Sequence, residues 1–120
     1  MHEKVIIVDE YTEKDVKLNQ GEINALKKAI LYLKFECEEE SSLIFSGSEL
    51  INSAFEKLLS NSDSYVSELN FYSKGNAYAE DFMLEKLKRQ KDFYGESDDN
   101  KECDTEYVKI CIYPYKKIRS

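Results

Sequence analysis

The clearest helical pattern in the chain follows Asn19 or Gln20, either of which could begin a helix. Apolar side chains there recur every three or four residues, as on one face of a helix: Ile23, Leu26, Ile30, Leu33 and Cys37. Leu31 and Phe35 add a second apolar face, which predicts a central helix. Because carboxylates are unfavourable at a helix C-terminus, the acidic run 38–40 predicts that the helix ends near Phe35 and that an extended segment follows.

Two further segments are predicted to be helical. Serines at 46 and 48 provide a cap for a helix that runs to about Ser60 and buries the stripe Ile51, Ala54, Phe55, Leu58 and Leu59. Asn76 can cap a helix to about Asp92, closed by Gly95, in which Phe82, Met83 and Leu87 are buried and basic side chains lie near the C-terminal end. The segment 65–72 fits a helix or a strand.

Strand patterns occur toward both ends of the chain. Lys4–Val8 is a continuous run rich in β-branched side chains, typical of a strand covered on both faces. Tyr107–Tyr113 alternates, with Val108, Ile110 and Ile112 predicted to face inward and Cys111 outward, before Pro114 ends the strand. Residues 12–18 are predicted to form a loop or a weak edge strand, and residues 96–104 an exposed loop.

This order of elements predicts a single α+β domain over residues 1–120. About three helices would pack on a small sheet that includes the N-terminal and C-terminal strands. A chain of 120 residues is within the usual size of one domain with one core. The oligomeric state and the order of the sheet are left open by the sequence.

The composition disfavours several classes of protein. A formal net charge of −7 disfavours direct binding to nucleic acid, which needs lysine and arginine against the phosphates. We expect neither an export signal nor a membrane span, because no apolar run is long enough. Three cysteines cannot all pair within the chain, so a reducing cytoplasmic location is expected.

Candidate chemistry is sparse. His2 is the only histidine, it lies near an end of the chain, and catalysis by serine or cysteine usually needs a histidine base. Cys103 and Cys111 lack the spacing of a zinc site, the acidic loop around Asp98 lacks the glycine of a calcium-binding loop, and the four glycines are isolated. The sequence therefore predicts no catalytic residue, no metal site and no cofactor.

Charge and tyrosine are unevenly distributed. The segment 36–68 holds eight acidic residues against one lysine, whereas basic residues gather at 86–91 and 116–119. Nine tyrosines and no tryptophan also favour an interface, because a tyrosine ring buries area and keeps a hydrogen bond, although an AT-rich genome would equally supply tyrosine. The predicted contact residues are Glu36, Glu38, Glu39, Glu40, Asp98, Asp99, Glu102, Asp104, Tyr107 and Tyr113.

These features favour a small acidic cytosolic protein that binds and neutralises a basic protein partner, for example a nuclease. The profile resembles that of bacterial toxin-immunity proteins and phage anti-defence proteins, although no motif identifies either family. One alternative is a carboxylate-based enzyme or metal-binding protein using Asp9, Glu80 or Asp81. Another is a structural or adaptor subunit that pairs through its last strand.

Overall fold

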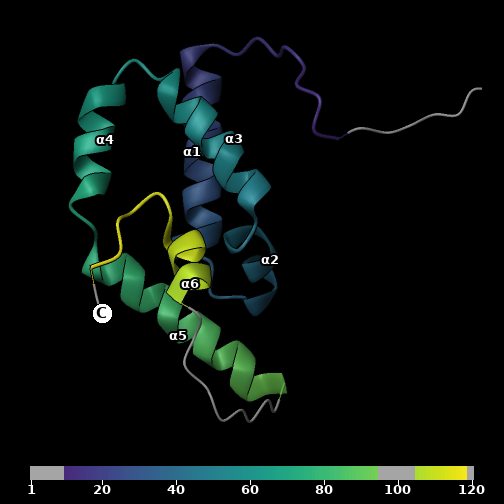
Figure 1. Cartoon of the computed structure of the whole chain (residues 1–120), viewed down its shortest axis with the longest axis vertical. Helices are drawn as coiled ribbons and strands as arrows, with labels where there is room; N and C mark the ends of the chain where they lie inside the picture. The colour runs from purple at the N-terminus through teal and green to yellow at the C-terminus, as the bar shows by residue number, and fades with distance from the viewer. Residues whose placement is uncertain (1–9, 95–104, 119–120) are drawn as a thin grey trace, which may run out of the picture.

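A computed structural model describes residues 10–94 and 105–118, and within these ranges the protein is all-helical (Figure 1). Six α-helices and one short 3₁₀ helix follow one another along the chain. They are α1 (Gln20–Phe35), η1 (Glu40–Ser42), α2 (Leu43–Ser46), α3 (Glu49–Ser60), α4 (Tyr65–Ser73), α5 (Ala77–Tyr94) and α6 (Thr105–Ile112).

Side-chain caps explain where three helices begin. Asn19 accepts a hydrogen bond from the main-chain N–H of Glu22, while the Glu22 carboxylate accepts one from the N–H of Asn19. This reciprocal capping box satisfies amides that the first turn of a helix leaves free. Ser48 caps α3 through the N–H of Ile51, and Asn76 accepts from the N–H of Ala79 in α5. All three caps confirm the sequence prediction.

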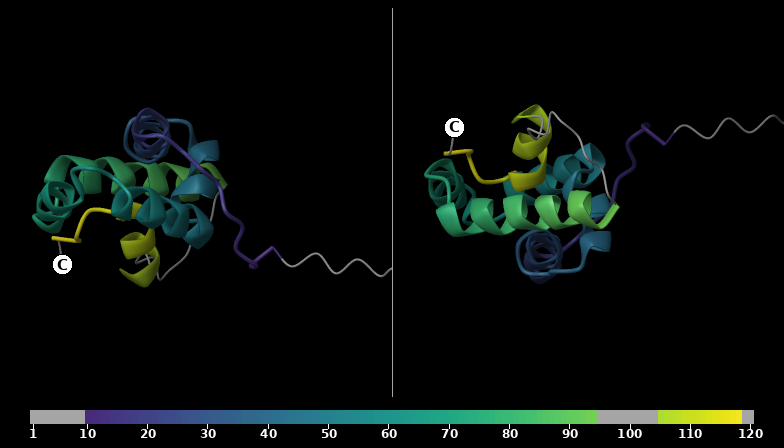
Figure 2. Two further views of the ribbon diagram at one scale, coloured as in Figure 1. Left: turned by 90° about the horizontal axis from the view of Figure 1, so that it is seen from above. Right: turned by 90° about the horizontal axis from the view of Figure 1, so that it is seen from below.

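Helix α5 lies between α1 on one side and α6 on the other, as both views in Figure 2 show. Helices α1 and α3 pack side by side, and α2 joins the end of α1 to the start of α3 (Figure 1). Helix α4 is tied to α1 by an ion pair in which the ammonium of Lys27 lies 2.8 Å from a Glu68 carboxylate oxygen. Helix α5 therefore forms a middle layer between α1 and α6, while α3 packs against α1 and α4.

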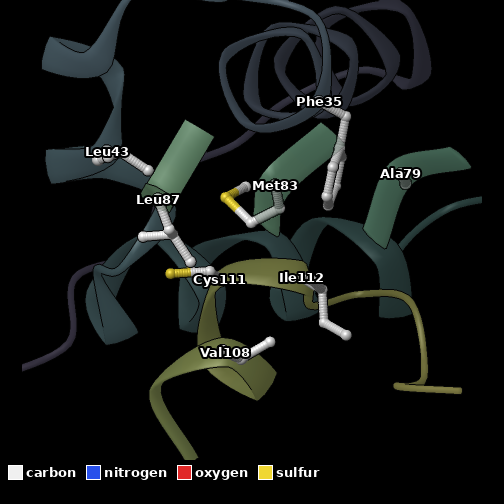
Figure 3. Close-up of a cluster of buried hydrophobic side chains, with 8 residues drawn as sticks. All are labelled: Phe35, Leu43, Ala79, Met83, Leu87, Val108, Cys111 and Ile112. Atoms are coloured by element: carbon white, nitrogen blue, oxygen red, sulfur yellow. The ribbon is translucent and has the colours of Figure 1, made fainter. Parts of the chain in front are cut away.

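The first core cluster fills the space between α5 and its neighbours. Met83 is fully buried near its centre, with Phe35 on one side and Cys111 and Ile112 on the other (Figure 3). Ala79 and Leu87 lie one turn before and one turn after Met83, so α5 contributes a continuous apolar stripe. The remaining members of the cluster are Leu43 and Val108.

The second core cluster joins α3 to α4. Phe55 is fully buried and contacts the ring of Tyr72 edge to face, with 6.1 Å between centroids. Leu59 completes the buried set. Tyr115 packs partly buried against both core clusters, so the segment after α6 connects them.

That C-terminal segment, residues 113–118, crosses the turn between α4 and α5. The N–H of Lys116 donates to the carbonyl of Tyr72 at 3.2 Å, and the N–H of Ile118 donates to the buried Glu80 carboxylate at 3.0 Å. Gly75 forms the turn with a φ of 75°, where a Cβ would overlap Cγ2 of Ile118. Only glycine combines this φ with such a close approach.

The predicted α+β fold is wrong for the described residues, because none of them belongs to a strand or a sheet. The segment predicted as the last strand is mostly α6. Its residues Val108, Cys111 and Ile112 are buried at helical spacing, so Cys111 faces the core and not the solvent. Packing against α5 and α2 outweighs the β preference of valine, isoleucine and tyrosine. The adaptor hypothesis, which needed this strand, loses its basis.

Other predictions have mixed outcomes. Helix α1 ends at Phe35 as expected, so Cys37 lies beyond the helix and is half-buried. Segment 65–72 is helical, while Phe82 is half-buried and not buried. The predicted strand 4–8, the closing Gly95 and the loop 96–104 lie outside the described residues. Within the described ranges no helix combines the length and the apolar character needed to cross a membrane.

Candidate functional site

The first predicted acidic cluster lies in the turn between α1 and η1. Glu36, Glu38 and Glu39 are exposed, and Glu40, the first residue of η1, is half-buried. No lysine or arginine occurs in the chain from residue 36 to residue 48. We call residues 36–40 the acidic segment.

Arg89 of α5 fixes one end of the acidic segment. Its Nε donates to the Glu40 carboxylate at 3.1 Å, and a terminal guanidinium nitrogen donates to the carbonyl of Glu38 at 3.3 Å. The hydrogen bond from Arg89 is the largest cause that lowers the pKa of Glu40 below its ordinary value. Arg89 therefore orders the turn and neutralises one of its four carboxylates.

Lys86 of α5 approaches the same turn from inside. Its side chain is fully buried, and its ammonium donates to the carbonyl of Cys37 at 2.7 Å and to the hydroxyl of Ser42 at 2.8 Å. It also donates to the carbonyl of Leu33 at 3.1 Å, one of the last carbonyls of α1. Burial is the main cause that lowers the pKa of Lys86. The oxygen atoms that accept hydrogen bonds from the Lys86 ammonium are all uncharged.

Lys34 is the second fully enclosed lysine, with an exposed fraction of 1%. Its ammonium donates to Oδ1 of Asn52 at 2.7 Å and to the carbonyl of Tyr113 at 2.6 Å, and it lies 5.6 Å from the Tyr113 ring centroid. Removal from water lowers the pKa of Lys34 to about 7. This lysine binds the C-terminal segment to α1 and α3.

These orientations determine the charge at the surface beside the acidic segment. Lys34 and Lys86 are close to it in the fold, but both direct their ammonium groups inward. Glu36, Glu38 and Glu39 therefore face solvent without a compensating lysine from either position. The net negative charge exposed at the acidic segment is therefore larger than a count that includes Lys34 and Lys86 would indicate.

Sequence reasoning missed the buried lysines because lysine is almost never fully buried. The predicted stripe on α1 ran through Leu26 and Leu33, whereas the buried positions are Ile23, Lys27, Lys34 and Phe35. Lys27 and Lys34 are seven residues apart and share helical spacing with Ile23, which is the one signal that could have indicated them.

The two predicted aromatic anchors differ in their surroundings. Tyr107 has an exposed fraction of 38%, and its ring lies over Gly47, where a Cβ would come within 2.6 Å of the phenol oxygen. Tyr113 is half-buried and contacts Phe55 edge to face, with 6.0 Å between ring centroids. Tyr107 therefore has more surface to offer a partner. The second acidic cluster, Asp98, Asp99, Glu102 and Asp104, lies outside the described residues.

The described residues contain no group of three histidine, cysteine or acidic side chains that could hold a metal ion. Of the carboxylates considered for catalysis, Glu80 is buried and accepts from the C-terminal segment, Asp81 is exposed, and Asp9 lies outside the described ranges. His2 and Cys103 also lie outside them.

A separate groove of about 770 Å³ lies where the segment 14–18 passes the pair α1 and α3. Its apolar lining is made by Val16, Leu18, Ile23, Leu26, Ala54 and Leu58, and its polar lining by Lys14, Lys17, Lys57 and Asn61. Neither Glu80 nor Asp81 lines it. Sequence reasoning missed this groove, because its walls come from three segments that only the fold brings together.

Comparison of the chain with protein-family models, with curated proteins and with solved structures found no match.

Proposed function

We propose that this protein binds a basic macromolecular partner and neutralises it by covering its functional surface. The partner would be a protein whose own ligand is acidic, such as a nuclease with a cationic cleft. Toxin-immunity and anti-defence inhibitors act in this way, and the proposal concerns this mode of action and not membership of either family.

The observation that supports the proposal is the inward orientation of the neighbouring cations. Lys34 and Lys86 satisfy carbonyl and hydroxyl oxygens in the interior, while Glu36, Glu38 and Glu39 remain exposed. Exposed carboxylates of one sign raise the association rate with a cationic partner and disfavour anionic ones. Arg89 and Lys86 hold the main chain of this turn, so the carboxylates are partly ordered before binding.

Tyr107 is the aromatic residue that best fits the role of an anchor. Its ring rests on Gly47, at the end of α2, and α2 follows the acidic segment directly through η1. An aromatic side chain beside a charged patch combines apolar contact with a hydrogen-bonding hydroxyl. Asp98, Asp99, Glu102, Asp104 and Tyr113 remain predicted contacts. A cytoplasmic location remains an expectation, because three cysteines cannot all pair within the chain.

The test is capture of a partner by the immobilised full chain at about 50 mM and about 500 mM salt, because screening weakens exposed charge pairs. The triple variant E36K/E38K/E39K is compared with E56K/D63K/E85K, which reverses three exposed carboxylates elsewhere and has the same net charge. We expect capture of a basic protein that high salt and the first variant abolish and the second leaves largely intact.

Equal loss in the two triple variants would show that only net charge matters and would contradict a role for the acidic segment. Capture that is insensitive to salt and to both variants would contradict the electrostatic basis of the proposal. Once the partner is identified, its activity is assayed with increasing amounts of the wild-type chain. Inhibition complete at a one-to-one ratio is the expected result, and full activity in the complex would contradict neutralisation.

A further inference from the structure

We propose that the groove between segment 14–18 and the pair α1 and α3 binds an aliphatic carboxylate of the fatty-acid class. This site is independent of the proposed partner surface. It lies near the start of α1, whereas the acidic segment follows the other end of that helix.

The size and the lining of the groove fit a small amphiphile. A volume of about 770 Å³ is within the range of about 300–1,000 Å³ that is usual for small-molecule sites. Leu26 is 45% exposed and Leu18 is 38% exposed, so apolar surface along the groove is in contact with water. An alkyl chain lying on these side chains would remove that surface from water, which is favourable.

The positive charge along the edge of the groove favours an anionic ligand. Lys14, Lys17 and Lys57 line it, and no acidic residue does. Lys57 pairs with Glu13 at 2.7 Å, and the hydrogen bond from Lys57 is the main cause that lowers the pKa of Glu13. For Lys14 and Lys17 the described residues provide no ion-pair partner. Two ammonium groups beside an apolar surface are complementary to a single carboxylate on an alkyl chain.

The same pattern argues against other small amphiphiles. A cationic headgroup would be repelled by the ammonium groups of Lys14 and Lys17, and a neutral alcohol would leave both without a counterion. Asp15 lies between Lys14 and Lys17 in the sequence but does not line the groove. The chain carries a formal charge of −7, so a lysine-lined apolar groove contrasts with the rest of its composition.

Binding is tested with the full chain and 11-(dansylamino)undecanoic acid, whose fluorescence rises in an apolar site. Unlabelled dodecanoate, dodecanol and dodecyltrimethylammonium then compete, each below its aggregation concentration. We expect dodecanoate to displace the probe at a concentration at least about tenfold lower than the other two, which corresponds to one favourable ion pair of about 1.4 kcal/mol. Equal competition by all three, or no binding of the probe, would overturn the proposal.

Variants locate the site. A54W fills the groove from an exposed position of α3, and S53W places the same side chain at the neighbouring exposed position that does not line it. We expect A54W to abolish probe binding and S53W to preserve it. K14E/K17E should weaken dodecanoate at least about tenfold and leave dodecanol unchanged. Circular dichroism verifies that each variant is folded.

Two further measurements separate this proposal from its alternatives. The acidic-segment variant E36K/E38K/E39K should bind dodecanoate as the wild type does, so failure of partner capture and failure of fatty-acid binding are distinguishable. A helical peptide of leucine and glutamate is added as a competitor. Displacement of the probe by this peptide but not by dodecanoate would overturn the assignment in favour of a protein segment.

Discussion

Lys34 and Tyr113 are separated by 79 positions in the chain, and the ammonium of Lys34 donates a 2.6 Å hydrogen bond to the main-chain carbonyl of Tyr113. Asn52 accepts from the same ammonium and donates to the carbonyl of Ile110 at 2.9 Å. One buried side chain thus joins α1, α3 and the end of α6. The cohesion of the bundle depends on a polar junction as well as on its apolar clusters.

Lys34→Met is therefore expected to lower the free energy of unfolding by about 2–4 kcal/mol at pH 9.5, where the folded chain has released the Lys34 proton and the cost of burying its charge is small. The apolar side chain would leave the carbonyl of Tyr113 and Oδ1 of Asn52 without this donor in the interior, at about 1–3 kcal/mol each. Urea unfolding followed by circular dichroism measures the change. Lys28→Met, at an exposed position of the same helix, should change stability by less than about 0.5 kcal/mol. Equal effects of the two variants would contradict a structural role for the Lys34 side chain.

Stability should rise with pH between about 7 and 9.5. Burial lowers the pKa of Lys34 from 10.5 to about 7 in the folded chain, so below pH 7 the folded state bears the full cost of a buried ammonium. Above pH 7 the folded chain releases this proton while the unfolded chain keeps it. The unfolded state then binds more protons, and the free energy of unfolding increases by at most about 1.4 kcal/mol per pH unit.

The ionisation of buried tyrosines sets the upper pH limit of this rise in stability. Burial raises the pKa of Tyr72 and of Tyr113 to about 12, so above pH 10 the unfolded chain ionises first and stability falls. Urea titrations at half-unit intervals measure the profile. Lys34→Met should reduce the rise, and the lowered pKa of Lys86 contributes in the same direction. A flat or falling profile between pH 7 and 9.5 would contradict this account.

Lys86→Met tests the end of α1. The ammonium of Lys86 binds carbonyls of the last turn and of Cys37, and it provides positive charge where the helix dipole is negative. We expect a loss of about 2–4 kcal/mol, because several buried acceptors lose their donor together. Lys88→Met, an exposed neighbour on α5, is the matched control. Hydrogen exchange should also show faster exchange of the amides of Glu36 and Cys37, and unchanged exchange there would exclude the capping role.

Gly75→Ala tests the turn beneath the C-terminal segment. A Cβ at φ 75° is strained, and it would also lie 2.8 Å from the carbonyl oxygen of Lys116. We expect a loss of about 2–4 kcal/mol, of which about 1–2 kcal/mol comes from the left-handed backbone. Gly21→Ala, in the first turn of α1, should alter the midpoint of thermal unfolding far less. Similar midpoints for the two variants would show that the segment can move away from the turn.

How far the sequence determined the fold is clearest at α1 and α6. Around α1, a cap at Asn19 and the unfavourable position of the glutamates after Phe35 gave both ends of the helix correctly. At α6, apolar and polar side chains alternate over seven residues, as in a strand. The spacing of Val108, Cys111 and Ile112 also fits one face of a helix. Only the packing of this segment against α5 and α2 decides between the two, and that contact is not local.

The candidate site was predictable only in outline. Exposed glutamates at 36, 38 and 39 follow from their polarity, and the structure places them in solvent. The inward orientation of Lys34 and Lys86 is not evident from the sequence, because it depends on carbonyls that folding brings within reach. The groove could likewise not be predicted from the sequence, since Val16 and Leu58 line the same groove only after α1 and α3 pair.

The packing of Tyr115 against both core clusters has a consequence for synthesis on the ribosome. While the earlier helices emerge, neither cluster has its last aromatic contact, and the ammonium of Lys34 has no Tyr113 carbonyl to bind. Domains generally fold as units during translation. For this chain, both clusters gain their last aromatic contact only after residue 115 has left the exit tunnel.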